Sequence, residues 1–109
     1  MDGTNAREEF EEHVKGMLVK CALVHQNYYW SDDKKPEITL PLNYTEAQYE
    51  AFLNQLDFSY DDGYGSQELF GMIWYTDGSW SHRGEYDGSE WWEHNSLPEI
   101  PEYLKGEIK

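Results

Sequence analysis

"YTDGSWSHRGEYDGSEWW", residues 75–92, contains one short phrase twice, an Asp-Gly pair set between large aromatic residues. Asp77-Gly78 and Asp87-Gly88 are typical two-residue turns, because aspartate and glycine tolerate the positive φ that a type I′ hairpin turn requires. The stretch therefore predicts three consecutive antiparallel strands joined by two tight hairpins.

A two-residue turn at Asp77-Gly78 would fix the register of the first hairpin and pair Tyr75 with Trp80. Side chains alternate between the two faces of a strand, so this register divides the hairpin residues into two groups. One face is expected to carry Ile73, Tyr75, Trp80 and His82. The opposite face is expected to carry Met72, Trp74, Ser81 and Arg83.

Two further strands are expected upstream of this region, and the first strand of the hairpins begins near residue 68. Residues 17–26, "MLVKCALVHQ", form an apolar run typical of a buried strand, although the same run also continues the 3.6-residue period of a preceding helix. Gly16 interrupts such a helix and favours the strand. Residues 38–42, "ITLPL", predict an edge strand because proline cannot donate to the ladder. Residues 68–75, "ELFGMIWY", are apolar on both faces and predict a central strand.

Two helices are expected. Residues 45–57 begin with a capping box of Thr45 and Gln48, and Tyr44 and Tyr49 form the matching hydrophobic staple. The apolar stripe of this helix comprises Tyr49, Phe52, Leu53 and Leu56. A shorter acidic helix is expected within residues 1–15, where Asn5 and Glu8 form a second capping box.

The order of these elements predicts an α+β fold. We expect an antiparallel sheet of about 4–5 strands, with the 45–57 helix packed on one face and a short N-terminal helix. A chain of 109 residues forms a single domain, residues 1–109. Residues 1–15 are expected to be an acidic helix that is either docked or mobile, and residues 98–109 a tail that wraps the surface.

The charge is strongly one-sided. Twenty-two acidic residues against eight Lys and Arg leave a formal net charge of −14, and Arg83 is the only basic residue between Pro36 and Leu104. Such a field repels nucleic acids and anionic membranes and attracts basic protein surfaces. Direct binding of nucleic acid is therefore not expected, because the Lys/Arg footprint that neutralises phosphates is missing.

Sequence patterns for catalysis or for a cofactor are absent. The four histidines lack metal-ligand spacing, no phosphate-binding glycine motif occurs, and Cys21 is the only cysteine. We therefore expect a protein that is not an enzyme and that holds no cofactor or metal. With an acidic N-terminus, no apolar run long enough for a membrane span and no disulfide, it is expected in the cytoplasm.

The candidate binding site combines carboxylates with exposed tryptophans. Carboxylates on neighbouring strands and turns lie about 5–7 Å apart, which is similar to the spacing of phosphates along a nucleic-acid strand. Two adjacent tryptophans point to opposite faces of a strand, so one is expected to pack inward and the other outward. The expected partner-binding residues are Asp61, Asp62, Asp77, Glu85, Asp87, Glu90, Glu93, Trp80, Trp91 and Trp92.

Residues 63–94, "GYGSQELFGMIWYTDGSWSHRGEYDGSEWWEH", resemble a segment of small acidic proteins of tailed bacteriophages, most of which have no assigned role. The resemblance covers about a third of the chain and matches no catalytic residue. It implies a phage origin, and with it an inhibitor of a host defence enzyme, either a Cas effector or a restriction enzyme. Such an inhibitor would act in the host cytoplasm and occupy a basic nucleic-acid-binding surface in the manner of a DNA mimic.

Two other functions fit the same residues. The first alternative is a phage accessory protein that binds a host factor through its aromatic residues, without nucleic-acid mimicry. A small carbohydrate-binding or hydrolytic domain is the second alternative, with Trp91 and Trp92 as a sugar platform and paired carboxylates such as Glu85 and Glu90. A concave pocket lined by tryptophans would be needed for that second alternative.

Overall fold

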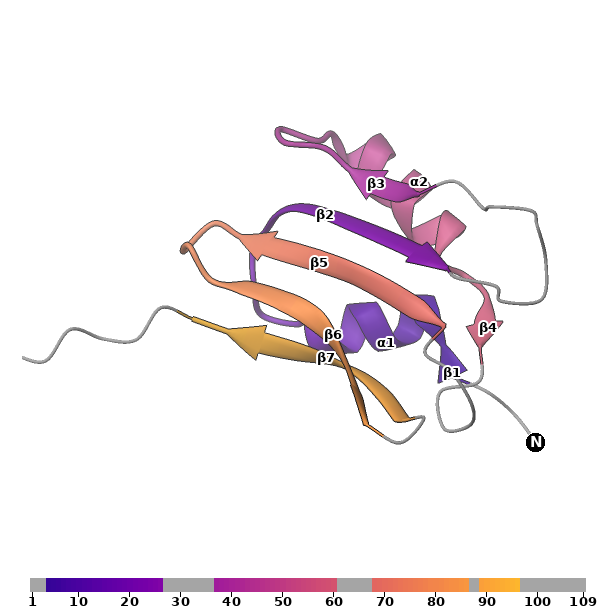
Figure 1. Ribbon diagram of the computed structural model, residues 1–109. Helices are drawn as coiled ribbons and strands as arrows, with labels where there is room; N and C mark the ends of the chain where they lie inside the picture. Colours follow the sequence, from indigo (N-terminus) through magenta and orange to yellow (C-terminus); the bar gives the residue numbers. More distant parts are fainter. Residues whose placement is uncertain (1–3, 27–36, 61–67, 87–88, 97–109) are drawn as a thin grey trace, which may run out of the picture.

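A computed structural model of the chain describes residues 4–26, 37–60, 68–86 and 89–96. Two helices and seven strands lie in these ranges (Figure 1). In chain order they are β1 (Thr4–Asn5), α1 (Ala6–His13), β2 (Val19–Gln26), β3 (Ile38–Leu40), α2 (Glu46–Gln55), β4 (Ser59–Tyr60), β5 (Leu69–Tyr75), β6 (Trp80–Tyr86) and β7 (Ser89–Asn95).

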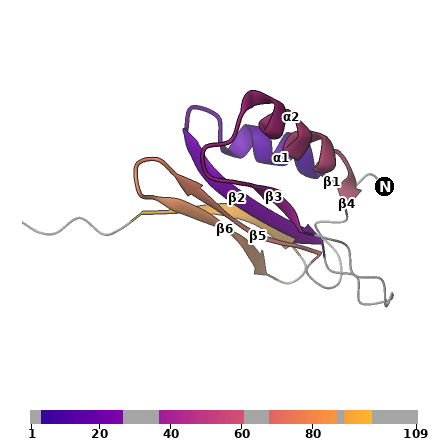
Figure 2. The ribbon, with the colours of Figure 1, turned by 90° about the horizontal axis from the view of Figure 1, so that it is seen from above.

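Five of the strands form one antiparallel sheet in the order β3-β2-β5-β6-β7. Both helices pack on the same face of this sheet, as Figure 2 shows from above. The α+β fold expected from the sequence is confirmed, with β5 at the centre of the sheet and β3, which Pro41 follows, at one edge. The short pair β1–β4 forms a separate two-stranded ribbon that the sequence did not predict.

The second helix begins as the sequence predicts. The Thr45 hydroxyl accepts a hydrogen bond from the Gln48 backbone N–H at 3.1 Å, and the Gln48 side chain accepts from the Thr45 N–H at 2.8 Å. The rings of Tyr44 and Tyr49 stack with centroids 5.6 Å apart. Capping box and staple therefore both fix the entry of α2, which ends at Gln55.

The first helix is shorter than the expected 1–15. Asn5 is its N-cap and accepts a hydrogen bond from the Glu8 N–H at 2.9 Å. Gly16 adopts a φ of +84°, which only glycine tolerates readily, and the chain turns there before β2 begins at Val19. The strand interpretation of residues 17–26 is thus confirmed over the alternative of a continued helix.

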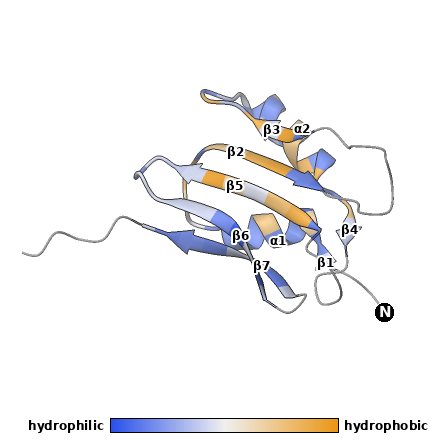
Figure 3. Ribbon diagram, viewed as in Figure 1, coloured by the Kyte–Doolittle hydropathy of each residue, from blue (hydrophilic) through white to orange (hydrophobic). Residues whose placement is uncertain are grey.

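The hydrophobic core lies between the helices and the covered face of the sheet. Phe10 of α1 meets Phe52 of α2 edge to face with ring centroids 5.2 Å apart, and both rings are fully buried. Val24 and Ile73 form the sheet side of this core. Figure 3 shows the apolar residues concentrated in β2, β3 and β5, while β6 and β7 are mostly polar. The apolar half of the sheet, β2, β3 and β5, therefore contributes most of the sheet's core residues, whereas β6 and β7 pack mainly through polar groups.

The hairpin between β5 and β6 differs from the expected register by one residue. Tyr75 N–H donates to Ser79 O at 3.0 Å and Gly78 N–H donates to Tyr75 O at 3.1 Å, which makes a three-residue connection. Gly78 has a φ of +90°, as expected where a type I turn is followed by a left-handed residue and a bulge. The Asp77 carboxylate favours this turn, because it accepts hydrogen bonds from the Ser79 backbone and hydroxyl.

The slip reverses the faces of β6. Trp74 lies opposite Trp80 and Ile73 opposite Ser81, so Ser81 and Arg83 share the buried face with Ile73. The expected grouping of Ile73 and Tyr75 with Trp80 and His82 is wrong, because a shift of one residue moves every side chain to the other face. The β6–β7 hairpin has Tyr86 opposite Ser89, in agreement with a two-residue turn.

Candidate functional site

Arg83, which the expected register had grouped with Met72 and Trp74, is instead buried beneath α1 on the face of Ile73. Its side chain is 1% exposed, and its two terminal nitrogens reach Glu9 Oε1 at 3.1 Å and Glu90 Oε1 at 3.3 Å. The guanidinium also donates to the Tyr60 hydroxyl at 2.7 Å and lies 5.1 Å from the centroid of the Trp92 ring. A buried charge is tolerated only with partners of this kind, so Arg83 joins α1, β4 and β7 to the polar half of the sheet.

Tyr60 completes this network as a donor. Its hydroxyl donates to Glu9 at 2.6 Å. Burial raises the pKa of Tyr60 far above its usual value, and the hydrogen bond to Glu9 raises it further. The phenol therefore stays protonated and bridges Arg83 and Glu9.

Glu90 was expected on an exposed carboxylate array and is instead a structural residue. Its side chain is fully buried, facing Arg83. Its two oxygens also accept hydrogen bonds from the backbone N–H groups of Glu68 at 2.6 Å and Leu69 at 3.0 Å, where β5 begins. Because a carboxylate with these partners has no contact with solvent, Glu90 cannot meet a partner protein directly.

The two adjacent tryptophans of β7 separate as expected, one inward and one outward. Trp92 is 8% exposed and packs edge to face against Phe10, with ring centroids 6.2 Å apart. Trp92 is therefore a core residue and not an exposed anchor. Trp91 lies on the opposite face, where its indole covers Gly84: a Cβ at Gly84 would come within 2.7 Å of Trp91 Nε1.

The face of the sheet opposite the helices carries a group of partly exposed apolar and aromatic residues, which we call the open aromatic face. In the described ranges no helix or strand packs over it, since both helices lie on the other side (Figure 2). Trp74 and Trp80 stand directly opposite each other on β5 and β6. The residues of the open aromatic face are Leu23, Phe70, Met72, Trp74, Trp80 and Trp91.

Within the described ranges, the remaining expected carboxylates do not form one array. Asp77 is exposed in the β5–β6 turn, whereas Glu85 is exposed at the far end of β6, roughly 20 Å along the strand. Glu93 is exposed on β7 and accepts a hydrogen bond from the Trp91 indole N–H at 3.1 Å. Asp61, Asp62 and Asp87 lie outside the described residues.

Exposed carboxylates gather on the helices, which the sequence analysis did not single out as a site. Arg7 partly neutralises this layer through ion pairs with Glu11 at 3.4 Å and Glu50 at 3.3 Å. The exposed acidic residues of the two helices are Glu8, Glu11, Glu12, Glu46 and Glu50. The molecule therefore presents an acidic helical side and an aromatic sheet side.

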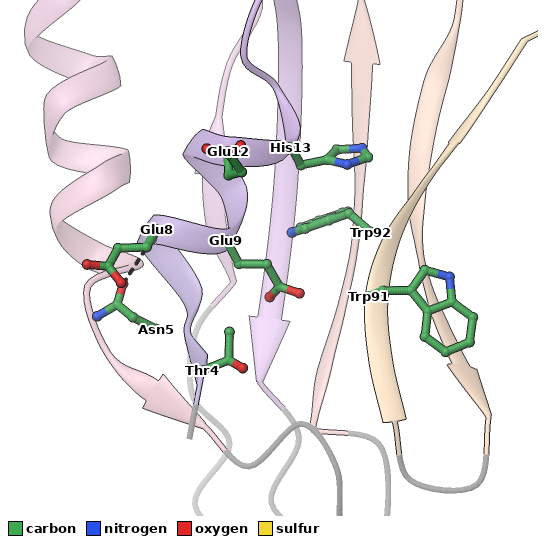
Figure 4. A pocket seen from close by; sticks show the side chains of 8 residues that line it. All are labelled: Thr4, Asn5, Glu8, Glu9, Glu12, His13, Trp91 and Trp92. Atoms are coloured by element: carbon green, nitrogen blue, oxygen red, sulfur yellow. Dashed lines mark hydrogen bonds between the residues drawn. The ribbon is translucent and has the colours of Figure 1, made fainter. Parts of the chain in front are cut away.

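A groove of about 540 Å³ runs between α1 and β7, and we call it the acidic groove. Figure 4 shows the glutamates of α1 along one wall and the inward-pointing Trp92 on the other, with Trp91 turned away. The residues that line it are Thr4, Asn5, Glu8, Glu9, Glu12, His13, Trp91 and Trp92. The sequence signal for this groove was the run of glutamates at helical spacing, but its position beside β7 depends on tertiary packing.

Two histidines contact serine hydroxyls of the β5–β6 region. His13 contacts the Ser81 hydroxyl at 2.8 Å, and His94 contacts the Ser79 hydroxyl at 2.9 Å. Burial lowers the pKa of His13, and the nearby His94 and Arg83 lower it further. Among the described residues, no group of three or more His, Cys, Asp or Glu is placed to hold a metal ion.

Comparisons with known proteins add no relative: no family model, curated protein or solved structure matches the chain. Within the described ranges, neither helix has the length and apolar character needed to cross a membrane.

Proposed function

We propose that this protein is a binding protein without catalytic activity, which docks the open aromatic face onto a basic surface of another protein. The observation that carries the proposal is the position of Trp74, Trp80 and Trp91 on a sheet face that no described element covers. Tryptophans are strongly enriched among the residues that dominate binding energy at protein interfaces. Contiguous exposed apolar patches on soluble domains commonly mark such interfaces.

The net charge defines the chemistry of the partner. At −14, the chain is attracted to a positively charged surface, and association is accelerated at low salt. Basic protein surfaces commonly bind nucleic acid, so a protein bound there would compete with the nucleic acid. Together with the resemblance to phage proteins, this supports a stoichiometric inhibitor of a host defence enzyme, such as a Cas effector or a restriction enzyme.

The test compares capture by the wild-type protein and by variants of the open aromatic face. Trp80→Thr/Trp91→Thr removes two partly exposed indoles, and Leu42→Thr, at an exposed apolar residue between β3 and α2, is the matched control. A protein captured from bacterial lysate is identified by mass spectrometry, purified and titrated against each variant. We expect the double variant to weaken affinity by at least about 30-fold and the control by less than about 2-fold.

The identity of the captured protein is part of the test. The proposal requires a basic, nucleic-acid-binding protein whose capture decreases with salt and is competed by DNA or RNA. Equal binding by wild type and Trp80→Thr/Trp91→Thr, with both proteins folded by circular dichroism, would contradict the assignment of the open aromatic face.

A second candidate places the contact on the acidic helical side. Glu8 and Glu12, and likewise Glu46 and Glu50, are one helical turn apart, about 6 Å along the axis, which is close to the spacing of phosphates. In that case the carboxylates of the two helices, and not those of the hairpins, would mimic the phosphates of nucleic acid. The variant Glu46→Lys/Glu50→Lys should slow association several-fold in this case, and an unchanged rate at low salt would exclude it.

A further inference from the structure

The outer edge of β7 is free in the described part of the chain. β7 is the last strand of the sheet, and its pairing residues all face β6. Every second residue of an edge strand presents its backbone N–H and C=O away from the sheet. Such an edge is a template for another strand.

The acidic groove lies directly beside this edge. Its wall is the side of α1 that carries Glu8, Glu9 and Glu12, and its inner end is closed by His13 and Trp92, whose rings stack with centroids 6.2 Å apart (Figure 4). A strand added to β7 would therefore point alternate side chains toward α1.

Two of the four glutamates in α1 have no cation in the described ranges. Glu9 pairs with Arg83 and Glu11 pairs with Arg7, whereas no ion pair involves Glu8 or Glu12. Like charges four residues apart destabilise a helix by a few tenths of a kcal/mol. Glu8 and Glu12 thus carry a small cost for the free protein, and both face the groove.

The spacing of these two carboxylates matches an extended chain. One helical turn separates Glu8 and Glu12 by about 6 Å along the axis, and alternate residues of a strand lie about 6.7 Å apart. We infer that an extended basic segment of a partner protein adds to β7 as a further strand and places two Lys or Arg side chains, two residues apart, against Glu8 and Glu12. This inference deepens the proposed function, on which the choice of a basic partner rests.

Charge decides against the other possible occupants. A second copy of the chain would bring a protein of the same net charge, −14, to a groove that is already acidic. The chain's own residues 97–109 follow β7, but their sequence has three glutamates against two lysines that are four residues apart, and two prolines, which cannot donate to a ladder.

The test uses a synthetic ten-residue peptide with lysine at alternate positions and threonine or valine between them. Its binding to the full-length protein is measured by fluorescence anisotropy at about 50 mM salt. The same peptide N-methylated at alternate residues keeps its charge but cannot pair with an edge. We expect the unmodified peptide to bind, to protect β7 amides from hydrogen exchange, and to lose most of its affinity on N-methylation.

Glu8→Gln/Glu12→Gln removes both unpaired charges. It should lower the affinity for the peptide by about 5- to 10-fold, as expected for two partly exposed ion pairs. Glu37→Gln/Glu46→Gln removes the same charge at exposed residues away from the groove and should change affinity by less than about 2-fold. Equal effects of the two variants, or equal binding of the N-methylated peptide, would overturn the inference in favour of nonspecific attraction.

Two further readouts separate this inference from its alternatives. A dimer by sedimentation, with β7 amides protected in the free protein, would assign the edge to a second copy and overturn the inference. Peptide binding should persist in Trp80→Thr, because Trp80 does not line the acidic groove. If the peptide does not bind, the inference about the acidic groove is refuted and the proposed function is not. Loss of binding to the captured partner in the tryptophan variant tests the open aromatic face instead.

Discussion

Replacing Arg83 by methionine should be among the most destabilising changes in this protein. The substitution keeps the unbranched apolar stem of the side chain but removes the guanidinium, which leaves the buried Glu90 carboxylate without its cation. Removing one member of a buried ion pair costs about 3–5 kcal/mol, because the remaining charge stays desolvated. Unfolding of 109 residues has an entropy near 2.1 cal/mol/K per residue, so this loss lowers Tm by roughly 13–22 °C.

The assay is a double-mutant cycle in urea. Arg83→Met, Glu90→Gln and Arg83→Met/Glu90→Gln are compared with wild type by the free energy of unfolding. Glu90→Gln keeps a side-chain oxygen that can accept the hydrogen bond from the Leu69 N–H, which is 3.0 Å long in the wild type. Because glutamine is neutral, the double variant has no unpaired buried charge at this position. We expect the double variant to be less destabilised than the sum of the single ones, by about 1.5–3 kcal/mol.

Additive behaviour would refute this reasoning. If Arg83→Met cost less than about 1 kcal/mol, the pair would behave as a solvent-exposed ion pair, in conflict with side chains that are 1% and 0% exposed. If Arg83→Met does not fold at all, the comparison of Glu90→Gln with wild type still measures the contribution of the carboxylate.

Three other substitutions test the packing, titration and capping described above. Gly71→Ala would place a Cβ 2.5 Å from Leu23 O, so we expect a loss of about 1–3 kcal/mol in urea unfolding. His13 is neutral in the fold because burial lowers its pKa below the ordinary 6.5, so the unfolded chain takes up the proton first. As the pH falls from 7.5 to 5.5, wild type should lose stability relative to His13→Asn, and parallel pH profiles would contradict this. Thr45→Ala removes the acceptor of the Gln48 N–H and should cost about 1 kcal/mol, with a smaller helical signal by circular dichroism.

Local sequence signals predicted the elements that local physics controls. Thr45 and Gln48 mark the start of α2, and Gly16 marks the turn into β2, because each acts through its own backbone and its nearest neighbours. Pro41 likewise placed β3 at the edge of the sheet. The same reasoning could not find β1 and β4, which are two residues long and depend on each other for pairing.

The candidate site was less accessible from the sequence. A glutamate next to a hairpin turn is expected to be exposed. Only the contacts of the Glu90 carboxylate with Arg83 and with two backbone N–H groups show that it is buried. Asp77 and Glu85 are close in the repeated phrase but lie at opposite ends of β6. The repeated phrase therefore predicted two turns of the same kind, but the first is a three-residue connection, and the length of β6 separates the two turns.

One additional residue in the β5–β6 connection decides which side chains of β6 lie on the open aromatic face. With a two-residue turn, Trp80 would face the helices and Arg83 would face solvent. The three-residue connection instead turns Trp80 toward the open aromatic face beside Trp74 and buries Arg83 against Glu90. The Asp77 carboxylate, which holds Ser79 in this turn, has its pKa lowered by those hydrogen bonds and so stays ionised. Asp77 thus helps to set the register that brings three tryptophans to one face, and under the proposed function this face is the binding surface.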